Sequence, residues 1–198
     1  MDCPPSQAER INSFALVCYL PGALGTFIDS LRRELVTNCV ARSHVTILPP
    51  RPLGAVLRGD LSLNDSRSEA RAQVAGCVPD FAPFQVELAN VEIFPKTQVI
   101  YLELTRGSGH LRILHDSLNS KALLFDEPHQ YHPHVTLAQD VAPGDVVAAH
   151  ELACARWQEF HHSRAFQAET LTFVQNTQEN RWIDLMGYEL GSMAGVAR

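Results

Sequence analysis

His44-Val45-Thr46-Ile47 and His134-Val135-Thr136-Leu137 are two versions of one phrase, a histidine and a threonine separated by a valine. In an extended strand, residues i and i+2 point to the same face, so each imidazole lies beside a hydroxyl while the valine points into the core. A chain with nine histidines is expected by composition to hold roughly 0.08 such tetrads. Two of them indicate a shared role, and we expect two motif strands that hold one phosphate from opposite sides.

The length and the composition predict one compact domain. The chain has 198 residues, of which 45% are hydrophobic, enough to bury a sizeable core. We therefore expect a single domain over residues 1–198, made of two closely packed lobes, with frayed tails at 1–12 and 191–198. The five cysteines are odd in number and form no C-x-x-C pair, which favours buried thiols in a reducing compartment.

Charge and hydropathy narrow the class of protein further. No apolar run approaches membrane-spanning length and no signal-like segment opens the chain, so we expect a cytoplasmic protein without a membrane partner. A net charge of −6 argues against a protein that coats long nucleic acid, because such binding needs an extended basic surface. A nucleotide or a short RNA end remains compatible as the partner.

Each motif is preceded by the same pattern. An apolar strand at 14–20 and a helix at 24–35 come before the first motif, and a strand at 99–104 and a helix at 109–124 come before the second. Pro49-Pro50 is expected to end the first motif strand, because proline cannot donate to a ladder.

The segments after the motifs also repeat. A helix and then a strand follow each one, and Phe84-Gln85-Val86-Glu87 is echoed by Phe166-Gln167-Ala168-Glu169 at an offset of 82 residues (166 − 84). A last strand is expected at 181–190. This repetition predicts an internal duplication and an α+β fold with a pseudo-twofold, bilobal architecture. Two antiparallel sheets would flank a central cleft, with the helices outside.

The motifs and their surroundings resemble those of the two-histidine (2H) phosphoesterase superfamily, in particular its 2′-5′ RNA ligase-like and cyclic nucleotide phosphodiesterase branch. The signature of that family is a pair of His-x-Thr/Ser-hydrophobic motifs, which here start 90 residues apart (134 − 44). Tyr131-His132-Pro133 also resembles the family's approach to its second motif, although Gln139 stands where many members carry an arginine. The resemblance implies the same bilobal fold, His44 and His134 as the catalytic pair, and a 2′,3′-cyclic phosphate or a 2′-5′ phosphodiester as the substrate.

The residue types fit this chemistry without a cofactor. Neutral imidazole accepts a proton and imidazolium donates one near pH 7, so two histidines beside one phosphorus can divide the proton transfers of an in-line displacement. Thr46 and Thr136 would donate hydrogen bonds to the non-bridging phosphate oxygens, where charge must be stabilised. We therefore expect a metal-independent hydrolase, without deciding which histidine is the base.

Four further residues are predicted to bind the substrate. Arg42 and Arg51 flank the first motif and could give a cleft its positive charge. Tyr131 could stack on a nucleobase, and His132 is expected at the rim of the cleft.

Two other kinds of protein stay open. His129, His132 and His134 lie within six residues, and histidine is a common zinc ligand, so a zinc-dependent hydrolase is one alternative. A non-catalytic RNA- or nucleotide-binding module is the other. We expect a monomer in each case.

Overall fold

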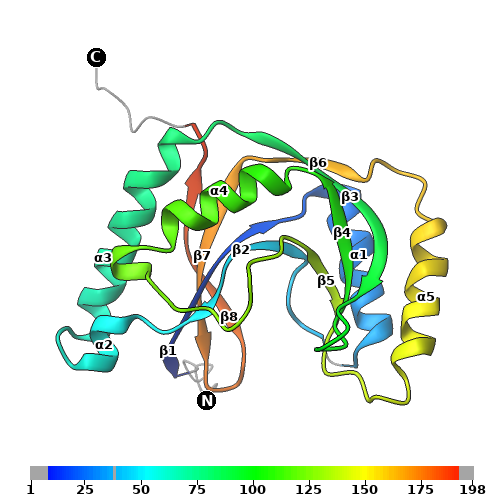
Figure 1. The fold of residues 1–198 in the computed structure, drawn as a ribbon, viewed down its shortest axis with the longest axis horizontal. Coiled ribbons are helices and arrows are strands. Elements are labelled where there is room, and N and C mark those ends of the chain that lie inside the picture. Colours follow the sequence, from blue (N-terminus) through cyan, green and yellow to red (C-terminus); the bar gives the residue numbers. More distant parts are fainter. Residues whose placement is uncertain (1–8, 38, 192–198) are drawn as a thin grey trace, which may run out of the picture.

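The computed structural model describes residues 9–37 and 39–191, and it contains two four-stranded antiparallel sheets with helices packed around them (Figure 1). Across sheet A the strands are β2 (His44–Arg51), β1 (Arg10–Tyr19), β7 (Thr170–Thr177) and β8 (Trp182–Glu189). Across sheet B they are β5 (Val135–Ala138), β4 (Ile100–Arg106), β3 (Phe84–Ile93) and β6 (Ala165–Ala168). The predicted α+β class with two antiparallel sheets is confirmed.

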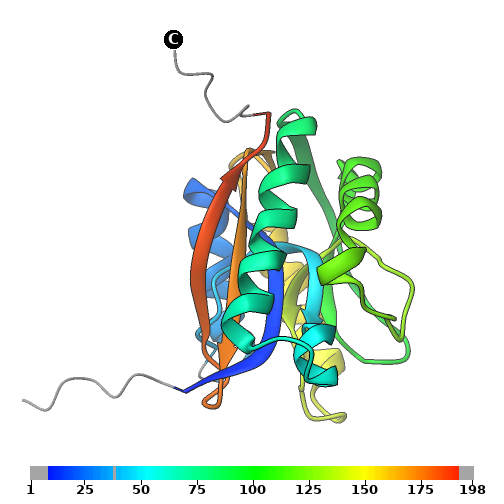
Figure 2. The same ribbon diagram turned by 90° about the vertical axis from the view of Figure 1, so that its left-hand side faces the viewer.

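In the described residues, five α-helices and two short 3-10 helices connect the strands. They are α1 (Gly22–Leu35), α2 (Gly54–Arg58), α3 (Leu63–Cys77), η1 (Val78–Asp80), α4 (Ser108–Leu118), η2 (Lys121–Leu123) and α5 (Val146–Gln158). Helix α3 runs alongside β7 and β8 (Figure 2). Helix α4 ends at Leu118, earlier than the helix predicted over 109–124, because the chain turns away there into η2.

Each sheet combines strands from both halves of the chain. The first half sends β3 to pair with β4 in sheet B, and the second half sends β7 to pair with β1 in sheet A. The helices cross over in the same way, since α1 packs against β5 and α4 packs against β2. The two lobes are therefore interlocked, and neither lobe corresponds to one half of the sequence.

The pseudo-twofold axis lies between the two segments whose sequences repeat. Strands β3 and β6 pair antiparallel, with Gln85 opposite Gln167 and Phe84 opposite Ala168. Residues related by the 82-residue offset thus face each other across one ladder, as a twofold axis between them requires. Strand β8 lies on the outer side of β7 and has no counterpart in the first half of the described chain.

The start of β1 and the end of β2 differ from what the sequence predicted. Strand β2 continues through Pro49 and Pro50 to Arg51, which pairs with Phe14 beyond a register shift. The prolines are tolerated because β2 is an edge strand, where a missing N–H leaves no ladder partner unsatisfied. Residues 10–12, expected in a frayed tail, belong to β1. Residues 1–8 and 192–198 of the expected tails lie outside the described part of the chain.

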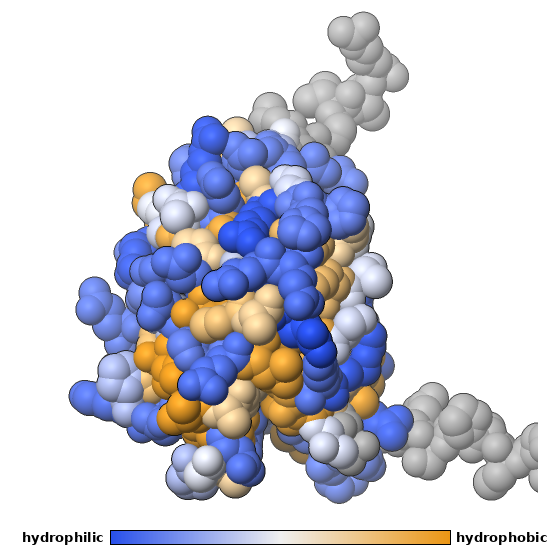
Figure 3. All heavy atoms as spheres, turned by 90° about the vertical axis from the view of Figure 1, so that its right-hand side faces the viewer, coloured by the Kyte–Doolittle hydropathy of each residue, from blue (hydrophilic) through white to orange (hydrophobic). Residues whose placement is uncertain are grey.

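One face of the molecule exposes a group of apolar atoms. Figure 3 shows the side on which α5 lies, with apolar atoms gathered in its lower half, where α5 begins. No helix in the described residues is long and apolar enough to cross a membrane.

Candidate active site

The two motifs have the same pattern of burial. His44 and His134 are half-buried, Val45 and Val135 are fully buried, and the threonines that follow are again half-buried. Strand alternation produces this pattern because every second side chain points into the core. Strands β2 and β5 also contact each other, so the fold brings the two motifs together from opposite lobes.

Both histidines are oriented by the same hydrogen bond. The Nδ1 atom of His44 lies 2.7 Å from the carbonyl oxygen of Arg42, and Nδ1 of His134 lies 2.7 Å from the carbonyl oxygen of His132. A carbonyl oxygen only accepts, so Nδ1 must carry the hydrogen in each ring. In the neutral ring Nε2 then keeps its lone pair, which leaves both histidines with a basic nitrogen for an incoming group.

Helix α1 fixes the backbone that leads into the first motif. The Ser43 amide donates to Asp29 Oδ1 at 2.6 Å, and the Ser43 hydroxyl donates to the Gly25 carbonyl oxygen at 3.2 Å. Gly25 has no room for a side chain, because a Cβ there would lie 2.2 Å from the carbonyl oxygen of Leu20. This close approach of α1 to the backbone just after β1 fixes the position of Ser43, and therefore of His44.

A charged and hydrogen-bonded group surrounds His44. Tyr19 lies opposite His44 in the β1–β2 ladder, with the two rings edge to face at 6.3 Å. The guanidinium of Arg42 lies 3.8 Å from the centre of the Tyr19 ring and 3.6 Å from Asp184 Oδ2, while the Tyr19 hydroxyl donates to Asp184 Oδ1 at 2.6 Å. The Arg42 side chain is 60% exposed, so it remains accessible to a ligand.

Aromatic rings surround His134 instead. Phe94 and Tyr101 are stacked with their centres 3.9 Å apart, and both are edge to face with the His134 ring, at 5.0 and 5.4 Å. His132 packs edge to face against the same two rings. Tyr101 lies opposite Thr136 in the β4–β5 ladder, so this cluster shares the face of the second motif.

Burial controls the charge of both histidines. Desolvation lowers the pKa of His44 to about 4, with smaller contributions from Arg32 and from the charged form of His134. The pKa of His134 is also lowered, mainly by desolvation and further by His132. Both rings are therefore neutral near pH 7 when no ligand is bound, and His134 is close enough to influence the charge of His44.

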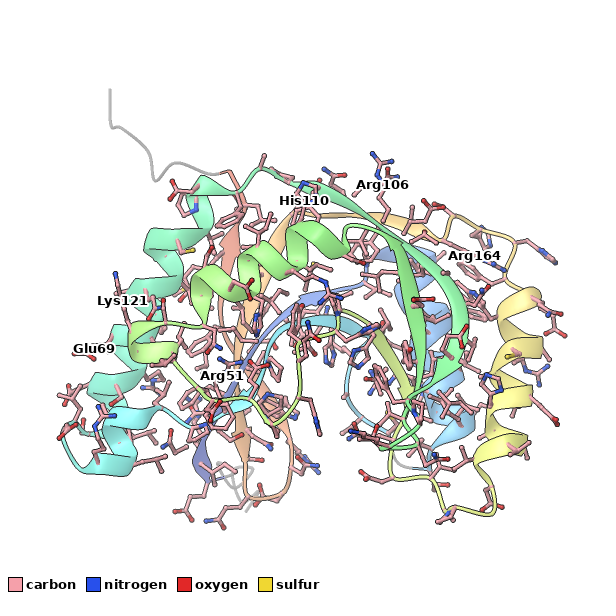
Figure 4. The ribbon with its side chains drawn as sticks, in the orientation of Figure 1. Arg51, Glu69, Arg106, His110, Lys121 and Arg164 are labelled. Atoms are coloured by element: carbon pink, nitrogen blue, oxygen red, sulfur yellow. The ribbon has the colours of Figure 1, made fainter. Side chains whose placement is uncertain are left out.

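Arg51 does not lie where the sequence suggested. Its side chain is 1% exposed and pairs with Glu127, and it also donates to Asn119 Oδ1 and to the carbonyl oxygens of Pro49 and Leu123. Figure 4 shows it enclosed near the end of β2, whereas Arg106 and Lys121 lie toward the outside. The prediction that Arg51 binds substrate is wrong, because protein acceptors already occupy its guanidinium.

Tyr131 is also placed differently. Only 9% of it is exposed, its ring stacks on His115 at 4.1 Å, and its hydroxyl donates to the carbonyl oxygen of Thr46 at 2.6 Å. A ring enclosed in this way cannot serve as a platform for a nucleobase, which corrects that expectation. Arg42 and His132, by contrast, each stand two residues before a motif histidine and accept its Nδ1 hydrogen bond through their carbonyl oxygens, and their role in substrate binding stays a prediction.

The histidines suggested as zinc ligands do not form a ligand set. His129 is exposed in the loop before the second motif, while His132 and His134 lie with their ring centres 6.3 Å apart. Within residues 9–37 and 39–191 there is no group of three or more His, Cys, Asp or Glu side chains that could hold a metal ion. The described residues therefore give the zinc alternative no support.

Several residues at the site were missed by reasoning from sequence. They are Tyr19, Phe94, Tyr101 and Asp184, and behind the site lies the buried His115 of α4. Their positions depend on strand register and on distant pairing, for which the sequence carries no local signal. The one available clue was that Tyr19 and Tyr101 fall within the strands expected at 14–20 and 99–104, each of which precedes a motif strand.

The family model for the 2′-5′ RNA ligase superfamily matches residues 20–180, a span that includes both motifs. The chain belongs to the 2′-5′ RNA ligase superfamily. Among curated proteins, no sequence matches it.

Solved structures of similar fold agree with this membership of the 2′-5′ RNA ligase superfamily. LigT of E. coli complexed with 3′-AMP superposes with a TM-score of 0.64 at 16% identity, covering 94% of this chain and 100% of LigT. A crystal structure described as a phosphoesterase gives a TM-score of 0.63 at 15% identity, with the same coverage. A protein of Thermus thermophilus gives 0.59 at 16% identity, covering 90% of this chain and 98% of its own. At these identities the likeness establishes the fold.

Proposed function

We propose that this protein is a metal-independent phosphodiesterase that cleaves 2′,3′-cyclic phosphate or 2′-5′ phosphodiester bonds of nucleotides or RNA ends. The observation that carries the proposal is the pair of equivalent histidines, each with Nδ1 bonded to the carbonyl two residues earlier and Nε2 left free. Each has a threonine hydroxyl on the same strand face. Such a pair can serve one phosphorus from two sides.

His44 fits the role of general base. Its pKa of about 4 keeps Nε2 unprotonated at neutral pH, so it can take a proton from water as the new bond from oxygen to phosphorus forms. The bond from phosphorus to the ribose oxygen breaks in the same step. That leaving oxygen needs a proton, which His134 would donate from Nε2.

His134 must therefore be protonated in the complex with substrate. Its pKa is lowered in the free protein by desolvation, but an anionic phosphate beside the ring favours the charged form. Substrate binding itself would thus prepare the acid. The hydroxyls of Thr46 and Thr136 would donate to the non-bridging oxygens as negative charge develops on them.

The proposed substrate class also draws on the relatives. LigT of E. coli has been crystallised with 3′-AMP and with ATP, which shows that this fold can hold nucleotides. In this chain Arg42 is the exposed cation next to the first motif, and His132 with Phe94 forms the aromatic border of the second. A nucleotide offers a phosphate for the former and a flat base for the latter.

The test is a turnover assay with purified protein in excess EDTA. The panel comprises 2′,3′-cyclic nucleotides, cyclic-ended RNA, 2′-5′ linked dinucleotides and ADP-ribose cyclic phosphate, with product identity determined for each. Turnover of at least one substrate, undiminished by EDTA, is expected. Activity lost in EDTA and restored by zinc would support the zinc-dependent hydrolase instead. Nucleotide binding without any turnover would indicate a non-catalytic binding module.

A further inference from the structure

A buried polar network joins the end of the first motif strand to the segment that leads into the second motif. Arg51, the last residue of β2, donates from Nη1 to Asn119 Oδ1 at 2.8 Å and to the Leu123 carbonyl oxygen at 3.1 Å. Its Nη2 pairs with Glu127, whose side chain is 10% exposed. Removing one partner of such a buried ion pair would leave an unpaired buried charge and destabilise the protein. Arg51 is also held by several acceptors at once, which fixes the position of its guanidinium.

His115 continues the network from Glu127. Its Nε2 lies 2.9 Å from Glu127 Oε1, and its Nδ1 lies 2.8 Å from Asp116 Oδ1. Because its two ring nitrogens are bonded to two different carboxylates, the His115 ring is held in one orientation. The ring is buried in α4, with 6% of the residue exposed.

Tyr131 closes the network back onto the first motif. Its ring lies flat on His115, with an interplanar angle of 5°, and its hydroxyl donates to the Thr46 carbonyl oxygen at 2.6 Å. The carbonyl of Tyr131 itself accepts from Arg112 Nη1 at 2.6 Å. Strand β2 is an edge strand, paired with β1 on one side only, so backbone groups on its open edge need partners from outside the sheet. Tyr131 supplies one in the middle of the motif.

We propose that Tyr131 is a positioning residue that, with the Arg51–Glu127–His115 network behind it, sets the separation of the two histidine motifs. Tyr131 lies three residues before His134 in the chain and is bonded to the backbone of Thr46, 85 residues away. Tyr131 therefore links the two motifs directly, through three residues of chain on one side and one hydrogen bond on the other. This role rests on the proposed function, in which both motifs must meet one phosphorus. Displacing a catalytic group by about 1 Å can lower the rate on the order of 10²-fold.

The decisive variant is Tyr131→Phe, which removes the hydroxyl and keeps the ring stacked on His115. The matched control is Tyr188→Phe, because Tyr188 lies on β8 beside α3, away from both motifs. In the folded variant we expect kcat to fall about 10-fold or more while KM stays within about threefold, since only the alignment in the transition state is lost. An unchanged kcat would overturn the proposal. A raised KM with unchanged kcat would also overturn it, because Tyr131 would then contact the substrate directly.

A second variant tests whether the network acts as a unit. Glu127→Gln keeps the shape of the side chain but removes the charge shared by Arg51 and His115. We expect kcat to fall by about 3–10-fold, and the Tyr131→Phe/Glu127→Gln double variant to lose less than the product of the two single losses. Losses that multiply would show that the two residues act independently, which contradicts a single positioning unit.

A spectroscopic measurement separates this proposal from the proposed function. The ring nitrogens of His44 and His134 can be followed by NMR at neutral pH, with inorganic phosphate as the probe. In the parent and in Tyr188→Phe, we expect the NMR signals of both rings to shift over the same range of phosphate concentration. In Tyr131→Phe, we expect the two rings to respond at different phosphate concentrations. If the parent protein showed no turnover, only the proposed enzymatic function would be refuted. The NMR spectra would still test the positioning role of Tyr131. Identical phosphate responses in the parent and Tyr131→Phe would overturn the positioning role.

Discussion

Around His44 the neighbours are charged or hydrogen-bonded, namely Tyr19, Arg42 and Asp184, whereas around His134 they are the rings of Phe94, Tyr101 and His132. The backbone is the same on both sides, down to the 2.7 Å bond from each Nδ1 to the carbonyl two residues earlier. The duplicated frame therefore presents two like histidines, and the next layer of side chains distinguishes them. That difference gives a site that is otherwise nearly symmetric a polar side, which carries the exposed Arg42, and an aromatic side.

The largest effects are expected from the histidines themselves. His44→Ala and His134→Ala should each lower kcat by roughly 10²–10⁴-fold, the usual contribution of a positioned acid or base. Because both act in one transition state, the double variant should lose much less than the product of the single losses. Steady-state kinetics on folded variants measures this. Near-parent turnover in either one would end the two-histidine mechanism.

The threonines should show whether the two sides share one phosphate. Thr46→Val and Thr136→Val keep the side-chain shape and remove one donor, so each should lower kcat on the order of 10–10³-fold. Similar losses for the two variants are expected, because their burial and their place on the strand face are alike. If only one of the two variants were impaired, the phosphate would be held by one lobe, which would contradict a site with two equivalent sides. Leu57→Ala, on the exposed surface of α2, provides the control.

Acid should destabilise the protein partly through His44. Its pKa is about 4 in the folded protein against the ordinary value of 6.5, so between these values the unfolded chain binds more protons than the folded one. The free energy of unfolding should therefore fall as the pH drops from 6.5 toward 4, with no further change from this group at higher pH. His44→Gln should reduce that loss by on the order of 1–2 kcal/mol. Urea denaturation at several pH values checks this, and equal pH dependence in parent and variant would contradict the buried neutral imidazole.

The smallest effect should come from the residues two positions before each histidine. Arg42→Gln removes the exposed cation beside the first motif, so KM should rise about 3–10-fold with little change in kcat. His132→Gln on the aromatic side should change KM by less than about threefold for a substrate without a base, such as a cyclic ribose phosphate. Arg42→Lys serves as the charge-retaining control. Equal effects of the Gln variants on every substrate would show that the two sides are not distinguished by ligand chemistry.

The parts predicted from sequence are those encoded locally. His44-x-Thr46 and His134-x-Thr136 lie on one face each because alternation is a property of any strand. The duplication was readable for the same reason, since the strand and helix patterns repeat in order. Arg42 and His132 also lie near the motif histidines, because residues two positions apart along a chain cannot move far from each other.

The parts that were missed depend on partners far away in the chain. Arg51 stands close to the first motif in sequence, which suggested substrate binding, but its acceptors Asn119 and Glu127 lie 68 and 76 residues away. His115 reads as a helix-surface histidine until the loop carrying Glu127 folds over it. Tyr131 precedes a motif in a polar stretch, which suggested a ligand contact rather than a bond to the opposite lobe. No local pattern specifies which charged side chain will be enclosed by a later segment.

The exchange of β3 and β7 between the sheets has a consequence for the origin of this chain. A single ancestral unit, with one motif strand, would have had its last strand paired in a sheet that belonged to a second copy. In a strand-swapped homodimer of such a unit, each copy would complete the sheet of the other, and the site would form between two identical chains. Gene fusion would then have joined an existing dimer rather than created a new arrangement. It would also have freed the surroundings of the two histidines to diverge, because each half could mutate alone.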